Sequence, residues 1–143
     1  PGRSCYHRAM STDLYYLVYA TILTWVMIMT ASLLRSRGWT PSGMKVAFGN
    51  RADVPEASPM VARAERAARN MAENLPLFLA LVTVAHLGGA ASAREEIELG
   101  AALFFWARLV YFPVYLAGVP YLRTAIWSVS VAGMGLIAAA LIS

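Results

Sequence analysis

Apolar residues gather in long unbroken runs along the chain instead of on one face of each predicted element. The first run, Leu14–Leu34, contains no charged residue. At about 1.5 Å rise per residue it matches a bilayer core of about 30 Å. Two later runs cover Ile97–Leu116, interrupted by Arg108, and Thr124–Ile142, which has no charge. Runs of this length predict membrane-spanning helices.

A further helix lies between the first and second of these runs. It is predicted to begin at Ser58 and Pro59, because serine is a common N-cap and proline is favoured at the first helical position. The helix begins polar, becomes apolar at Leu75, contains a tolerated Pro76, and continues to about Ala91. Together the four helices predict an all-α, integral-membrane, four-helix up-and-down bundle.

Glycine and proline mark the connections between these helices. Residues 35–57 are predicted to form a polar loop, residues 88–96 a short turn, and residues 118–120 the break before the last span. Gly133 and Gly135, inside that last span, indicate close packing against a neighbouring helix.

The composition agrees with this architecture. Of 143 residues, 59% are hydrophobic and 14% are charged, and the mean hydropathy is +0.54; soluble domains carry about 25% charged residues. The net charge of +4 indicates loops beside anionic lipid, because basic and aromatic residues are not interleaved as in nucleic-acid-binding surfaces. The single Cys5 can form no intrachain disulfide, and no spacing suits a metal. Residues 1–9 are predicted to be a leader or an added extension, and residues 10–143 one domain.

The distribution of lysine and arginine predicts the orientation in the membrane. The connection between the first two helices is strongly basic, and the connection between the last two contains Arg123, whereas the middle connection contains only Arg94. The first and third connections are therefore predicted to be cytoplasmic, with both termini outside. The basic residues of the first connection are Arg35, Arg37, Lys45, Arg51, Arg63, Arg66 and Arg69.

Two polar clusters lie where a membrane makes polarity costly. Arg66, Arg69, Asn70 and Glu73 are spaced i, i+3, i+4 and i+7, which places them together on the second helix. They form either a ligand-binding face or simply a solvated helix end with an Arg69–Glu73 pair.

The second cluster is Arg108, Tyr111 and Tyr115 on the third helix. An arginine at a helix centre costs about 2.5–3.5 kcal/mol on insertion scales, so Arg108 is predicted to face the interior, with Glu73 as its partner. A purely structural ion pair would satisfy the same pattern. Together the two clusters suggest a cationic pocket that suits a small, anionic, peptide-like ligand, because guanidinium groups bind carboxylates through paired hydrogen bonds.

Two stretches resemble a known family. Glu65–Phe78 resembles the second-helix motif of the MAPEG superfamily, the membrane-associated proteins in eicosanoid and glutathione metabolism. Arg108–Tyr115, followed by Arg123, is similar to the later motif of its leukotriene-forming and glutathione-transferase members. Asn74 stands where the leukotriene-forming enzymes have a tyrosine, which argues against the eicosanoid reactions themselves.

The resemblance implies a homotrimer that binds glutathione, as co-substrate, between neighbouring subunits on the cytoplasmic side of an inner or plasma membrane, if the source is bacterial. It implies that Arg123 is the catalytic, thiolate-stabilising arginine. Arg35 or Arg37 corresponds to a further arginine of the family, and the sequence leaves open which. The implied glutathione-binding residues are Arg66, Arg69, Asn70, Glu73, Arg108, Tyr111 and Tyr115.

The sequence leaves three functions to compare. The first is a glutathione-dependent membrane transferase or peroxidase acting on lipophilic electrophiles. The alternative is a non-catalytic member of the fold, a lipid-binding or accessory subunit of a larger membrane complex. A small four-helix exporter is disfavoured, because such transporters usually couple protons through a carboxylate in the first span, and Leu14–Leu34 contains none.

Overall fold

The structure is a computed structural model that describes residues 10–50, 56–88 and 91–142. Every regular element in these residues is helical, so the prediction of an all-α chain is confirmed. The elements are α1 (Thr12–Ser36), α2 (Pro41–Phe48), α3 (Pro59–Leu87), the 3₁₀ turn η1 (Ala91–Ala93), α4 (Arg94–Ala117) and α5 (Pro120–Ile142).

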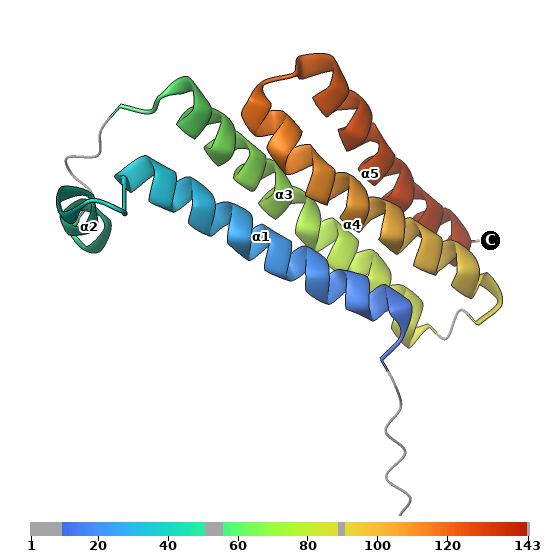
Figure 1. Ribbon diagram of the computed structural model, residues 1–143. Helices are drawn as coiled ribbons and strands as arrows, with labels where there is room; N and C mark the ends of the chain where they lie inside the picture. Colours follow the sequence, from blue (N-terminus) through green and yellow to red (C-terminus); the bar gives the residue numbers. More distant parts are fainter. Residues whose placement is uncertain (1–9, 51–55, 89–90, 143) are drawn as a thin grey trace, which may run out of the picture.

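The four long helices lie side by side, and each runs opposite to the one before it (Figure 1). Among the described residues, three helices are long and apolar enough to cross a membrane, namely α1, α4 and α5. The sequence predicts α3 as a fourth span, but this helix carries its polar residues in its first half and does not meet the same criterion.

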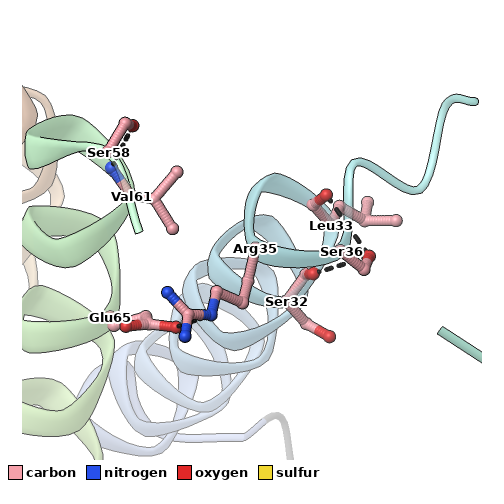
Figure 2. Close-up of polar contacts among 7 residues, drawn as sticks. All are labelled: Ser32, Leu33, Arg35, Ser36, Ser58, Val61 and Glu65. Carbon is pink, nitrogen blue, oxygen red and sulfur yellow. Dashed lines mark hydrogen bonds and ion pairs between the residues drawn. The ribbon is translucent and has the colours of Figure 1, made fainter. Parts of the chain in front are cut away.

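The start of α3 is as the sequence predicts. Ser58 is the N-cap, and its side-chain oxygen accepts a hydrogen bond from the backbone nitrogen of Val61 at 3.4 Å (Figure 2). Pro59 follows at the first helical position, and the helix continues through Pro76 to Leu87. The serine cap and the proline together explain why the helix begins at this point.

Residues 35–57 are not simply a loop, which corrects the sequence prediction. They contain α2, which follows the end of α1 and lies away from α3, α4 and α5 (Figure 1). The Thr40 side chain accepts from the backbone nitrogen of Gly43 at 3.0 Å, and Pro41 occupies the first helical position. The Thr-Pro pair is the signal that could have identified this helix, as Ser-Pro identified α3.

Helices α4 and α5 approach each other closely at two glycines. A Cβ atom on Gly133 would lie 2.6 Å from the carbonyl oxygen of Gly100, and the reverse substitution meets the same clash. The prediction of close packing is therefore confirmed for Gly133. It is wrong for Gly135 within this chain, because a Cβ there would have no neighbour within 4 Å.

The core lies between the four long helices α1, α3, α4 and α5 and is built mainly from buried apolar side chains. Phe78 of α3 and Phe104 of α4 stack with ring centroids 4.0 Å apart, and Met27 of α1 and Met71 of α3 are also fully buried. Stacked rings and flexible methionines fill the space between helices efficiently. This packing fixes α3 against α4, the two helices that carry the polar clusters.

Candidate functional site

Arg108 is the largest fully buried side chain among the described residues, with no exposed surface. It extends from α4 toward α3, and its Nη1 atom donates a hydrogen bond to Oδ1 of Asn70 at 2.5 Å. The prediction that Arg108 faces the interior is confirmed. The prediction that Glu73 is its partner is wrong, because Asn70 takes that place and Glu73 is exposed.

The helical geometry of α3 explains the difference. Asn70 lies on the edge of the buried face, whereas Arg66, Arg69 and Glu73 are all exposed. At about 100° per residue, Glu73 points roughly 60° further from α4 than Asn70 does. The four residues therefore separate into an outward trio (Arg66, Arg69 and Glu73) and one inward-reaching amide. The Arg69–Glu73 pair, which the sequence offered as the alternative to a ligand-binding face, is not among the ion pairs of the described chain, which are Arg35–Glu65 and Arg94–Glu98.

Two aromatic rings also lie close to the guanidinium of Arg108. Its Cζ atom lies 5.4 Å from the ring centroid of Phe104 and 5.4 Å from that of Tyr111. Its Nε and Nη2 atoms are buried and have no hydrogen-bond partner among the described residues. Cation–π attraction compensates part of the cost of burial, so Asn70 is the one polar partner on which this cation depends in the described chain.

A line of contacts continues from Arg108 along α4 to the first turn of α5. The rings of Tyr111 and Tyr115 meet edge to face with centroids 5.2 Å apart, and both side chains are buried. The Cζ atom of Arg123 lies over the Tyr115 ring at 4.7 Å from its centroid. Asn70, Arg108, Tyr111, Tyr115 and Arg123 thus form one connected group, hereafter the inner cluster.

Arg35 is joined to α3, whereas Arg37 is not. The Nε atom of Arg35 lies 3.5 Å from Oε1 of Glu65, and both side chains are about one-third exposed (Figure 2). Such a pair contributes about 0–1 kcal/mol, so it orients Arg35 more than it stabilises the fold. Arg37 caps the end of α1 in a left-handed conformation with φ 52° and is exposed. Of the two arginines that the sequence left open, Arg35 is the one held beside α3.

Arg63 belongs to the surroundings of the site and was not singled out from the sequence. Its Nε atom donates to the carbonyl oxygen of Leu116 at 2.9 Å, near the C-terminus of α4. The next turn contains Gly118 with φ +81°, and a Cβ there would lie 3.4 Å from the Arg63 guanidinium. Arg63 therefore fixes the turn that leads from Tyr115 to Arg123. The sequence did contain a signal for Arg63, because a residue three positions before Arg66 lies next to it on the surface of α3.

The family of the chain is shown by a match over most of its length. A model of the MAPEG family matches residues 12–143, which include every helix that the structure describes. The chain belongs to the MAPEG family. A search of curated proteins found no match for it. The MAPEG family is in general associated with glutathione-related transferase and peroxidase chemistry at membranes.

The polar side chains of this MAPEG chain match the charged and polar groups of glutathione. Glutathione carries two carboxylates, one ammonium group, two amides and a thiol. The exposed guanidinium groups of Arg66 and Arg69 suit carboxylates, and the exposed carboxylate of Glu73 suits an ammonium group. The outer edge of the inner cluster, at Asn70, lies one helical turn from Arg66 and supplies neutral hydrogen-bonding groups.

Proposed function

We propose that this protein is a glutathione-dependent membrane transferase or peroxidase that acts on lipophilic electrophiles. The observation that supports this most strongly is the unbroken line of contacts from Asn70 through Arg108, Tyr111 and Tyr115 to Arg123. The line begins beside the outward trio and ends at a half-buried arginine. It thus connects groups suited to binding a charged peptide with a cation suited to stabilising a thiolate.

The proposed site is shared between neighbouring copies of the chain in a homotrimer. The outward trio lies on the face of α3 opposite to the buried core, so one chain alone leaves these charges uncovered. Charged side chains next to the apolar half of a membrane helix are costly unless they face protein or water. A second copy placed against this face would enclose glutathione between the trio and its own surface.

In the proposed reaction, Arg123 stabilises the glutathione thiolate. A cation beside a thiol lowers its pKa and raises the fraction of nucleophile. In transfer, the thiolate forms a carbon–sulfur bond while the electrophile loses its leaving group as an anion. In peroxide reduction, two glutathione molecules give their electrons to a hydroperoxide, and the products are the disulfide, an alcohol and water.

The proposed orientation places this site on the cytoplasmic side. In this arrangement α3 is the fourth span, entering the bilayer at its apolar second half, and both termini lie outside. The support is the excess of arginine and lysine in the connections that lead into α3 and α5, because Arg66 and Arg123 lie in the first halves of these helices. Lipophilic substrates would then reach the thiolate laterally from the bilayer, close to the headgroups.

The test uses the full chain purified in detergent or reconstituted in bilayers. Glutathione is added, and the thiolate absorbance band, conjugation to an activated aryl chloride and reduction of a lipid hydroperoxide are measured. The proposal expects a thiolate band and turnover of at least one of these two substrates. Binding without turnover would select the non-catalytic, accessory alternative. Absence of both binding and a thiolate band would overturn a glutathione site altogether.

A further inference from the structure

We propose that α2 lies on the membrane surface and docks against anionic lipid headgroups, at the end of the molecule where α1 ends. The inference rests on the geometry and surface of α2 and is independent of the proposed glutathione chemistry. Three observations carry it: a tight joint to α1, an uncovered apolar surface and an unbalanced positive charge.

The joint between α1 and α2 is compact. Thr40 donates to the carbonyl oxygen of Arg37 with both its backbone nitrogen and its hydroxyl, each at 2.9 Å. Gly43 packs so closely that a Cβ atom there would overlap the carbonyl oxygens of Ser36 and Arg37. The orientation of α2 is therefore set by the end of α1, a helix apolar enough to span the membrane.

Large apolar side chains in α2, and just before it, are uncovered in the described chain. Trp39 is 66% exposed, Met44 48% and Phe48 86%. Met44 and Phe48 are spaced i, i+4 and therefore lie on one face of α2. Helix α2 packs mainly against α1 and lies away from the other long helices (Figure 1). Exposed aromatic residues beside a membrane-spanning helix are typical of the interface between lipid and water.

The charge of this segment favours anionic lipid over a second copy of the chain. Arg37 and Lys45 are exposed, and residues 36–50 contain no aspartate or glutamate to balance them. A short helix with apolar and cationic faces binds the headgroup region through both surfaces at once. The length of α1 is consistent with α2 lying at the membrane surface. The 25 residues of α1 span about 37 Å, which exceeds the hydrocarbon core of about 30 Å. The end of α1 and the joint to α2 are thus placed at headgroup level.

The experiment measures the depth of Trp39 by fluorescence quenching in the full chain. A variant that combines Trp25→Phe, Trp106→Phe and Trp127→Phe leaves Trp39 as the one tryptophan. It is reconstituted in zwitterionic bilayers and in bilayers that also contain phosphatidylglycerol. The quenchers are acrylamide in water, lipids brominated close to the headgroup and lipids brominated deep in the acyl chains. The matched reference keeps Trp25 instead, which is 64% exposed near the middle of α1.

The proposal expects shallow bromolipids to quench Trp39 most strongly, whereas deep bromolipids should be the strongest quenchers of Trp25. In anionic bilayers the shallow quenching should be roughly twofold greater than in zwitterionic ones, because each basic residue near the surface adds to the attraction. Arg37→Gln with Lys45→Gln should abolish that difference. Quenching of Trp39 by acrylamide alone would overturn the proposal. Shielding of Trp39 from all three quenchers would also overturn it and would point to a second copy as the occupant.

Discussion

The Nη1 atom of Arg108 donates to Oδ1 of Asn70 at 2.5 Å, joining the buried cation of α4 to the polar half of α3. Because this bond occupies the carbonyl oxygen of the Asn70 amide, the Nδ2 group is the end left for a ligand. Asn74 adds a second constraint, since its Nδ2 donates to the backbone oxygen of Asn70 at 2.8 Å. Asn70 thus connects the fold of the protein to its proposed binding site.

Two substitutions of Asn70 should separate these roles. Asn70→Asp keeps an acceptor for Arg108 but removes the amide donor, so the melting temperature should hold while glutathione binds about tenfold more weakly. Asn70→Leu leaves the buried guanidinium without its acceptor and should lower the free energy of unfolding by about 1.5–3 kcal/mol. Thermal unfolding in detergent and glutathione titration measure the two effects. Equal stability losses in both variants would contradict this role of Asn70.

The contact between Arg123 and the Tyr115 ring predicts a graded effect on the glutathione thiolate. Tyr115→Phe keeps the aromatic face beneath the guanidinium, so the thiolate band should remain near the wild-type level. Tyr115→Leu removes a cation–π contact of about 0.5–2 kcal/mol and should weaken the band several-fold. Arg123→Ala should lower it most. If Tyr115→Phe were as damaging as Tyr115→Leu, the hydroxyl rather than the ring would be the important group.

The two glycines in the second half of α5 provide a matched pair for stability. A Cβ on Gly133 would lie 2.6 Å from a backbone oxygen of α4, whereas one on Gly135 would meet nothing. Gly133→Ala should therefore destabilise the protein by about 1–3 kcal/mol, because backbone must shift. Gly135→Ala should be neutral or stabilising by about 0.5–1 kcal/mol, because alanine is the better helix former. Thermal unfolding of both variants checks this, and equal effects would refute the close approach.

Arg63 is expected to support the turn between α4 and α5. Arg63→Ala removes the hydrogen bond to Leu116 and should lower the free energy of unfolding by about 1–3 kcal/mol and also weaken the thiolate band. The control is Arg94→Ala, which removes an exposed i,i+4 pair with Glu98 and should cost about 0.3–0.5 kcal/mol without affecting glutathione. An unchanged thiolate band in Arg63→Ala would limit Arg63 to a purely structural role.

The sequence predicted the long helices because their signals are local. Uncharged runs and the Ser58–Pro59 start depend on neighbouring residues alone, and the observed bounds differ from the predicted ones by a few residues. The burial of Arg108 was also predictable, because exposing an arginine to lipid in the middle of an apolar helix is costly, so such a residue usually faces the interior of the bundle.

The partner of Arg108 was not predictable from charge alone. Glu73 is the acidic residue that lies deepest in α3, so charge alone favours it as the partner. The side chains of Glu73 and Asn70 leave α3 in directions about 60° apart, and the packing of α3 against α4 turns Asn70 toward Arg108. The contact of Arg63 with Leu116 depends on the start of α3 lying beside the end of α4. No local sequence pattern encodes that arrangement. Helix α2 was missed because it is only eight residues long and lies among glycines and prolines, which are typical of loops.

The most direct test of the proposed site is a titration of glutathione into wild type, Arg66→Ala, Arg123→Ala and Arg94→Ala, followed by calorimetry and by the thiolate absorbance band. The first two arginines belong to the outward trio and the inner cluster, and Arg94 lies at the other end of the molecule (Figure 1). We expect Arg66→Ala to weaken binding at least tenfold, Arg123→Ala to lose chiefly the thiolate signal, and Arg94→Ala to match wild type. Four identical titrations would contradict a glutathione site built from these residues.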